Sequence, residues 1–352
     1  MIQTNVLVVG AGPAGTTCAY LLKKAGVDCL LIDQATFPRD KICGGGLTSK
    51  TWHLIERLMP GFEYDYNPAN NIRLSMDGKA QCEICFNNPI RIVQRKNFDH
   101  ALLQQYLSID GKFQQDALLQ VEEKNDGHII ASLKSGESIT CQYLIGADGS
   151  NSRVRRYLTS STDRGVLILE QYGEKGIQYQ MTNFSPLLDK QRETTIDIFL
   201  SSAYDKSGYF YRFPNHAYDV VGFGDNSTTP EKFRRVMQEQ GFPDGKTLGT
   251  YLYLSNDYPL KENIILIGDA GGFANRVTWE GLYNAFRTAQ NAAEAIIRNR
   301  SFRETNAAVF QRMRYEDTAV KIFYSKFGYA LVRWLCHHPT LIKKIIDKKL
   351  EG

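Results

Sequence analysis

The sequence predicts an α/β fold (α+β overall) in which a Rossmann-type nucleotide-binding domain carries an inserted antiparallel sheet. Three observations predict it. Residues 6–33 combine an apolar strand, a glycine-rich turn, a helix and a second strand. Two later apolar strands end in glycine-aspartate motifs near residues 146 and 268. Residues 160–260 are rich in β-branched and aromatic residues and in turn signals, which is typical of antiparallel strands.

The first segment has the spacing of a dinucleotide-binding motif. Val6–Val9 is a continuous apolar run, typical of a buried parallel strand. It leads into a turn whose residues are predicted to meet a pyrophosphate: Gly10, Gly12, Ala14 and Gly15. The first glycine allows the tight turn, the second lets the backbone approach the phosphates, and the third lets helix 16–25 pack on the strand. The N-terminus of that helix then faces the phosphates.

An acid completes this motif. The second strand, CLLIDQ, ends at Asp33, where a carboxylate accepts hydrogen bonds from ribose hydroxyls. The same carboxylate disfavours a 2′-phosphate, so the tightly bound ligand is predicted to be FAD or NAD rather than NADP. No second GxGxxG opens a helix, since VVGFGDNST at 220–228 is better interpreted as a strand end. Separate FAD and NADPH domains are therefore disfavoured.

Two further motifs pair glycine with an acid at a strand end. One strand ends in Gly146-Ala-Asp148-Gly149, and Ser152 and Arg153 follow it. Another, IILIGDAGG, ends in Gly268-Asp269. One such pair is commonly only a β-turn. Three glycine-acid strand ends in this order indicate a ligand crevice at the carboxyl ends of the strands.

Composition excludes several other classes of protein. The chain has 352 residues, 43% hydrophobic and 23% charged, and its net charge of +4 does not favour nucleic-acid binding. No 18-residue apolar run predicts a membrane-spanning helix, and the N-terminus has no basic signal-peptide region. We therefore expect a cytoplasmic protein whose seven cysteines are reduced. Cys82 and Cys85 fall in a predicted strand and point to opposite faces, so we expect no metal site there.

Taken together, these motifs resemble the geranylgeranyl reductase family of the FAD-dependent p-hydroxybenzoate-hydroxylase-like superfamily, over roughly residues 1–300. The resemblance implies FAD as the cofactor, with Asp269 at its ribityl chain and Asp148 near the pyrophosphate. Arg95, in QRKNFD, matches the Arg-x-x-Phe-Asp helix start of the family and would contact FAD. Alone, it could equally be a solvated cation. Leu118 would clamp the adenine through its backbone.

If the cofactor is FAD, the start of a later helix also has an expected role. Gly281 and Leu282 open a predicted helix that runs to residue 298. Its N-terminal amides are expected to stabilise negative charge on a reduced flavin.

Two stretches resemble the reductase branch in particular. FPRDKICGGG is similar to a family loop that lies against the flavin ring, which implies flavin contacts for Gly44 and Gly45 and a proton-donating role for Cys43. YFYRFP at 209–214 is similar to the family's Tyr-x-Trp-x-Phe-Pro substrate motif, with Tyr211 in place of tryptophan. Alternation on a strand places Tyr209, Tyr211 and Phe213 on one face. That face suits an apolar substrate or an ordinary core, and a packing role for Cys43 also stays open.

One loop departs from the family. Relatives often have Pro-x-x-Gly-Glu-Gly-Ile after the glycine-aspartate motif, whereas this chain has Arg276-Val-Thr-Trp279-Glu280-Gly281-Leu282. If the loop faces the flavin, a cation and the indole of Trp279, a predicted substrate contact, occupy the reactive side.

The expected domain boundaries follow from these assignments. The FAD-binding domain is predicted at 1–75, 90–160 and 260–300, the substrate domain at 76–89 and 161–259, and a C-terminal helical segment at 301–352. Residues 318–352 carry seven lysines and arginines against two acids, interleaved with aromatic residues. This pattern suits either helices docked on the protein or a peripheral contact with the inner face of an anionic membrane. The oligomeric state stays open.

The leading hypothesis is an FAD-dependent oxidoreductase that reduces carbon–carbon double bonds of a prenyl-type or other lipid-like substrate. NAD(P)H or another reduced donor would supply the electrons. Isolated alkenes need a proton donor, and Cys43 and Tyr211 are the candidate catalytic residues. The first alternative is a monooxygenase that uses NAD(P)H and O₂; a halogenase is a weaker variant. A membrane-associated flavin-binding electron carrier is the third.

Overall fold

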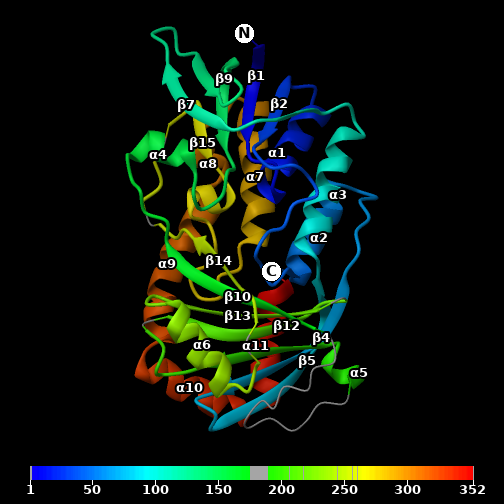
Figure 1. Cartoon of the computed structure of the whole chain (residues 1–352), viewed down its shortest axis with the longest axis vertical. Helices are drawn as coiled ribbons and strands as arrows, with labels where there is room; N and C mark the ends of the chain where they lie inside the picture. Colours follow the sequence, from blue (N-terminus) through cyan, green and yellow to red (C-terminus); the bar gives the residue numbers. More distant parts are fainter. Residues whose placement is uncertain are drawn as a thin grey trace.

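Two β-sheets lie one beyond the other along the long axis of the molecule in the computed structural model (Figure 1). The structure describes residues 2–174, 189–205, 207–216, 218–243, 245–255, 257–259 and 261–351. The mixed α/β architecture predicted from the sequence is confirmed.

The first sheet contains the N-terminal strand. Its order is β6-β2-β1-β9-β8-β7, and β15 pairs with β9. The bounds are β1 Ile2–Val9, β2 Cys29–Asp33, β6 Lys112–Gln115, β7 Leu118–Glu123, β8 Ile129–Leu133, β9 Ser138–Gly146 and β15 Ile264–Leu266. Strands β6, β2, β1, β9 and β15 run parallel, whereas β7, β8 and β9 form the predicted meander. Val6, Leu7 and Val8 are fully buried, as expected for a central parallel strand.

Helices cover both faces of this sheet: Val154 packs on one face with Leu7 and Val9, and most of the other helical residues pack on the opposite face with Val6 and Val8. The bounds of the helices are α1 Pro13–Lys24, α2 Ser49–Leu58, α3 Arg95–Leu107, α4 Arg153–Thr159, η1 Gly268–Gly271, α7 Leu282–Ile297 and α8 Phe302–Thr305. α7 packs against α1 because a row of buried alanines allows a close approach: Ala285, Ala289 and Ala292. This packing fixes the start of α7 beside the start of α1.

The second sheet has the order β14-β10-β13-β12-β11-β4-β5-β3. The bounds are β3 Gly46–Leu47, β4 Asn67–Met76, β5 Ala80–Ile92, β10 Val166–Glu174, β11 Thr195–Leu200, β12 Gly208–Pro214, β13 Tyr218–Asp225 and β14 Thr247–Leu252. All neighbours are antiparallel except β4 and β11. The first inserted segment is longer than the predicted 76–89, since the β4–β5 hairpin spans residues 67–92 and lies wholly in this sheet.

Of the remaining helices, the one that carries Val309 and Met313 packs in the core of the first sheet, and the others lie around the second sheet. The remaining helices are α5 Asp189–Arg192, α6 Pro230–Glu239, α9 Ala307–Phe323, α10 Lys326–Cys336 and α11 Pro339–Glu351. α10 and α11 pack on β4 and β5 through Tyr329, Val332, Cys336 and Ile342. The C-terminal segment is therefore docked on the substrate sheet along one face of its helices. Within the described residues, no helix is both long and apolar enough to cross a membrane.

Candidate active site

Four parallel strands end at one edge of the first sheet, and each is followed by a residue of the predicted site. Gly10 follows β1, Asp33 ends β2, Asp148 follows β9, and Asp269 follows β15. The carboxyl ends of neighbouring parallel strands form the crevice in which such folds bind ligands. The structure therefore brings together three acids that are widely separated in the sequence.

The glycine turn has little free space. Gly10 adopts a φ of 105°, and a Cβ there would overlap the carbonyl oxygen of Ala147. A Cβ at Gly15 would overlap the carbonyl oxygen of Gly10, so the start of α1 lies directly against the turn. Gly12 is the N-cap of α1 and offers no side chain to the first amides of the helix. These amides, with the small Ala14 among them, are left to bind a phosphate.

Two of the acids are held by backbone amides. Asp33 accepts hydrogen bonds from the N–H of Ala11 at 2.7 Å and of Ala35 at 2.8 Å, which fixes its carboxylate beside the turn. Asp148 Oδ2 accepts from Arg153 N at 2.6 Å, whereas its buried Oδ1 has no hydrogen-bond partner among the described residues. Burial raises the pKa of the Asp148 carboxyl. A hydroxyl or N–H donor of a ligand would satisfy this oxygen.

The third acid lies at the start of α7. A Cβ at Gly281 would come within 3.1 Å of Asp269 Oδ1, so the glycine leaves the carboxylate accessible. Gly281 is the N-cap of α7 and gives no side-chain cap to Leu282 and the amides after it. A carboxylate and uncapped amides thus lie side by side. Together with the glycine turn and the other two acids, they fit the phosphates, hydroxyls and ring carbonyl of FAD.

Leu118 occupies the first position of β7. It is buried and pairs with Leu133 of β8. This location is in the same sheet as the glycine turn, and the predicted adenine contact stays a prediction.

The glycines after Cys43 have neighbours within the protein. A Cβ at Gly44 or at Gly46 would lie 3.0 Å from the ring of Phe213 on β12. Gly45 adopts a φ of 76°, and a Cβ there would overlap the carbonyl oxygen of Val93. The absence of side chains is thus already required by a phenylalanine ring and by the strand beside the loop. Whether Gly44 and Gly45 also contact a flavin stays a prediction.

A cluster of charges lies beside Cys43. Arg95 donates to both oxygens of Asp99, at 2.8 and 2.9 Å, and also reaches the Cys43 thiol. The Gly45 N–H lies 3.4 Å from the same sulfur. Arg39 pairs with Asp99 at 3.1 Å, and its Nη2 would be 3.4 Å from a Cβ at Gly12. Sequence reasoning missed Arg39 and Asp99, although both fall in the quoted motifs FPRDK and RKNFD.

The predicted aromatic row on β12 forms. The ring centroids of Tyr209 and Tyr211 are 5.6 Å apart, and those of Tyr211 and Phe213 are 5.4 Å apart. The indole of Trp279 extends the row, 5.4 Å from Tyr209, and packs over Gly224. Phe213 brings the row against the Cys43 loop. The structure thus collects three predicted substrate contacts and the two candidate catalytic residues on one side of the second sheet.

The loop at 276–282, which differs from the family pattern, does not place a cation at the aromatic row. Arg276 is buried and donates to the carbonyl oxygens of Gly272, Ala274 and Ser255, and it pairs with Asp317 at 3.4 Å. The expectation of a cation on the reactive side is therefore wrong. The acids of α9 turn Arg276 inward, and the loop contacts the aromatic row through the indole of Trp279 and the Thr278 carbonyl oxygen, which accepts the Tyr209 hydroxyl.

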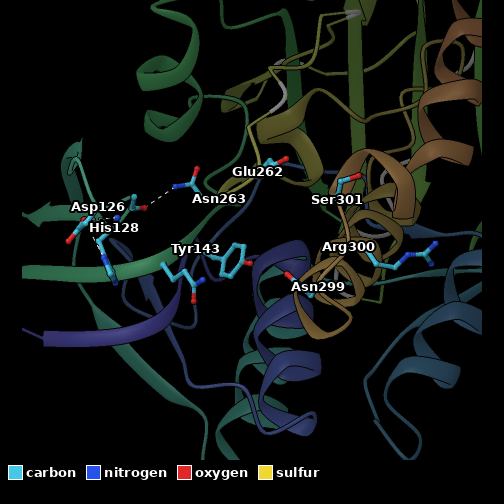
Figure 2. Close-up of a pocket in the computed structure, with 10 residues that line it drawn as sticks. Asp126, His128, Tyr143, Glu262, Asn263, Asn299, Arg300 and Ser301 are labelled. Carbon is cyan, nitrogen blue, oxygen red and sulfur yellow. Dashed lines mark hydrogen bonds and ion pairs between the residues drawn. The ribbon is translucent and has the colours of Figure 1, made fainter.

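A polar hollow lies elsewhere in the molecule (Figure 2). It is lined by the β7–β8 turn and by residues around the end of α7, among them Asp126, Tyr143, Glu262 and Arg300. Asn263 precedes β15, so this hollow lies toward the amino ends of the parallel strands. It contains none of the residues predicted for the cofactor or the substrate.

Comparison with known proteins agrees with the site. Residues 3–168 match the family model described as FAD binding domain. The chain is similar to a menaquinone reductase of Mycolicibacterium smegmatis, with 32% identity over 83% of this chain and 76% of the relative. It is also similar to digeranylgeranylglycerophospholipid reductase 3 of Methanosphaera stadtmanae, with 25% identity over 86% of this chain and 80% of the relative.

A solved structure shares the fold. The flavin-dependent brominase Bmp2 superposes with a TM-score of 0.73 over 99% of this chain and 93% of its own, at 17% identity. The match to the FAD-binding family model and the relatives named as reductases show that the protein is an FAD-dependent oxidoreductase. Within that class, the chain belongs to the geranylgeranyl reductase family.

Proposed function

We propose that this protein reduces carbon–carbon double bonds in an apolar, prenyl-type or related lipid-like substrate, with electrons from NAD(P)H or another reduced donor. The observation that carries the proposal is the aromatic row of β12, which lies against the Cys43 loop through Phe213. Tyr211 and Trp279 are buried, whereas Tyr209 and Phe213 are half-buried, so an apolar chain would gain free energy by covering the exposed parts of these two rings, about 25 cal/mol per Å² of apolar surface removed from water.

The residues of the site would have three separate roles: binding FAD, orienting the substrate and donating a proton. The glycine turn, Asp33, Asp148, Asp269 and the start of α7 would hold FAD, which supplies a hydride when it is bound and reduced. Tyr209, Phe213 and Trp279 would orient the apolar chain and exclude water. The carbon that does not receive the hydride needs a proton from the protein, since an isolated alkene is a poor hydride acceptor. Cys43 is one donor, because its thiol lies at the end of the aromatic row.

Two relatives named as reductases support this choice. A relative named as a brominase matches 83% of this chain at 25% identity, so the experiment must separate the two reactions. The test is to reduce the purified holoprotein without oxygen and add a geranylgeranyl lipid. Stoichiometric loss of double bonds and reoxidation of the flavin are expected. A product that contains oxygen and forms only after O₂ is admitted would establish the monooxygenase instead. Reoxidation by an acceptor protein, with the lipid unchanged, would establish the electron carrier.

We further propose that the C-terminal helices contact an anionic membrane surface, which would give access to a lipid substrate. On α10, Phe327, Leu331 and Trp334 recur at helical spacing and are 69%, 42% and 49% exposed. On α11, Leu341 and Ile345 are also exposed. Exposed lysines accompany them: Lys321, Lys326, Lys344, Lys348 and Lys349. An apolar face bordered by cations suits an interface with anionic headgroups.

Vesicle flotation tests this contact. The protein is expected to float with vesicles that contain anionic phospholipid and to float less in 0.5 M salt. Phe327→Ser combined with Trp334→Ser should reduce the floated fraction several-fold. Tyr315→Ser, which removes an exposed aromatic residue outside 318–352, is the matched control and should change nothing. Equal flotation of both variants would contradict the proposed surface.

A further inference from the structure

A buried glutamate joins the aromatic row to the Cys43 loop. Glu170 lies in the middle of β10 and is 1% exposed. Its Oε1 accepts the hydroxyl of Tyr211 at 2.5 Å, and its Oε2 lies 3.4 Å from the hydroxyl of Tyr172. The backbone N–H of Cys43 also donates to this carboxylate. Glu170 thus contacts both candidate catalytic residues, although nothing in the sequence motifs points to it.

The surroundings of Glu170 favour its neutral form. Among the described residues, no lysine or arginine forms an ion pair with it; Lys41 acts only at longer range and donates to Thr250 on β14. Burial raises the pKa of the Glu170 carboxyl to about 7. The other titratable groups that face it carry hydroxyls or a thiol: Tyr172, Tyr209, Tyr211, Tyr218 and Cys43.

The protonation state of Glu170 sets the direction of its bond to Tyr211. An ionised carboxylate can only accept, so the hydrogen of the Tyr211 hydroxyl must point to Glu170. A protonated carboxyl can donate to the Tyr211 oxygen instead, and the hydrogen of Tyr211 is then free to point along the aromatic row. Burial also raises the pKa of Tyr211 well above its usual value, so the hydroxyl keeps its proton at rest.

We propose that Glu170 supplies, through the Tyr211 hydroxyl, the proton that reduction of the substrate consumes. This inference rests on the proposed function. The Tyr211 O–H bond breaks as its hydrogen passes to one alkene carbon, and the proton of Glu170 moves to the Tyr211 oxygen in the same step. The other alkene carbon would take a hydride, which reduced FAD would supply when bound. The double bond would thereby gain two hydrogens, the two electrons would come from that hydride, and Glu170 would later regain a proton from water.

In this scheme Tyr211 contacts the substrate. Glu170 is a positioning residue that orients the Tyr211 hydroxyl and returns a proton to it. A tryptophan at 211, as in the family motif that YFYRFP resembles, could donate to Glu170 but could not pass a proton on, because its indole nitrogen accepts none. The tyrosine is therefore the feature of this chain that makes a relay chemically possible.

Four variants separate a relay from a structural role. Glu170→Gln keeps the shape and a hydrogen bond but does not titrate. Tyr211→Trp keeps a donor toward Glu170 but breaks the relay, and Tyr211→Phe removes both. Tyr172→Phe is the matched control, since it removes a hydroxyl from the same carboxylate and leaves the Tyr211 bond intact. FAD content and the visible spectrum of each variant serve as the test of folding.

The rate of flavin reoxidation by a geranylgeranyl lipid, measured in a single anaerobic turnover, is the activity readout. In the wild type and in Tyr172→Phe, the rate should fall about tenfold per pH unit above pH 7. In Glu170→Gln and Tyr211→Trp it should be independent of pH and at least tenfold slower at pH 6. If these two variants keep the wild-type rate and pH profile, the proton relay through Glu170 is wrong, while the proposed reduction of the alkene still holds. A wild type that reduces no alkene at any pH would overturn the proposed function and the relay with it.

A second readout does not depend on substrate. The infrared absorption of a protonated carboxyl should disappear between pH 6 and pH 8 in the wild type and in Tyr172→Phe, and it should be absent from Glu170→Gln. If no such band is present in the wild type at pH 6, Glu170 holds no proton there and the proposal is wrong.

Discussion

Two buried carboxylates flank the loop that carries Cys43, one from each half of the molecule. On the side of the nucleotide-binding sheet, Asp99 is fully buried between Arg95 and Arg39. On the side of the substrate sheet, Glu170 is equally buried but is bonded to tyrosine hydroxyls and a backbone amide. The two acids are similarly buried, but Asp99 lies between cations and Glu170 lies among neutral hydrogen-bond donors.

The difference teaches which acid can take part in proton chemistry. A carboxylate between two guanidinium groups is the counter-ion of both, and its loss would leave buried cations without a partner. A carboxylate among neutral donors pays the full desolvation cost of its charge and takes up a proton near neutral pH. Asp99 therefore orients Arg95 and Arg39, whereas Glu170 is free to exchange its proton.

Breaking the charged pair should have the largest effect. Asp99→Asn leaves Arg95 buried without its counter-ion, and removal of one partner from a buried pair costs about 3–5 kcal/mol. The free energy of unfolding, from urea denaturation, should fall by that amount. Asp40→Asn is the control, since Asp40 is exposed and pairs with Lys96 only at 3.8 Å; its effect should stay below about 0.5 kcal/mol. Equal effects of the two substitutions would contradict the assigned difference.

Protonation of Glu170 should be detectable in the pH dependence of the free energy of unfolding. The pKa of its carboxyl is about 7 when folded against 4.5 as a free side chain, so the unfolded state releases the proton first as pH rises. The wild type should therefore lose on the order of 3 kcal/mol of unfolding free energy between about pH 4.5 and pH 7. Glu170→Gln cannot titrate and should not lose this contribution. Parallel stability curves for the two proteins would show that Glu170 is ionised throughout.

A substitution in the nucleotide-binding half should change cofactor affinity, which Glu170→Gln should leave intact. Asp269→Ala removes the carboxylate beside the start of α7. Loss of a charged hydrogen bond of about 1.5–3 kcal/mol should raise the Kd for FAD roughly 10- to 150-fold. Quenching of flavin fluorescence during titration of the apoprotein measures this. Asp126→Ala, in the hollow at the other edge of the sheet, should bind FAD normally; a normal Kd for Asp269→Ala would exclude its predicted contact.

The smallest effect is expected where the aromatic surface itself is retained. Tyr211→Trp keeps an aromatic ring in the row and a donor toward Glu170 but adds volume to a buried site, so its unfolding free energy at pH 6 should fall by about 1–3 kcal/mol. Any larger loss, measured by urea denaturation, would mean that the space over Gly222, which the Tyr211 ring fills, cannot accept an indole.

Local motifs were sufficient to predict much of the site. GxGxxG, the two later glycine-acid strand ends and their order predict that Gly10, Asp33, Asp148 and Asp269 meet at one edge, because the geometry of parallel strands requires it. Alternation along a strand likewise predicts the row of Tyr209, Tyr211 and Phe213.

The rest depends on contacts between distant segments. Glu170 meets Cys43 only because two lobes come together, and Arg276 turns inward because α9 brings Asp317 to it. The three glycines after Cys43 could not be explained from their own sequence, since their neighbours are Phe213 and Val93. The predicted start of the first inserted segment, residue 76, lies nine residues after the start of β4 at Asn67, because the polar first half of β4 gives no strong strand signal.

The most direct test of the account is a single anaerobic turnover of the reduced holoprotein with a geranylgeranyl lipid at pH 6 and at pH 8.5, with mass analysis of the product. The account predicts that the lipid gains two hydrogens per flavin reoxidised, more slowly at the higher pH, and that Glu170→Gln abolishes this difference. A flavin that stays reduced until oxygen is admitted, with oxygen then found in the product, would contradict it.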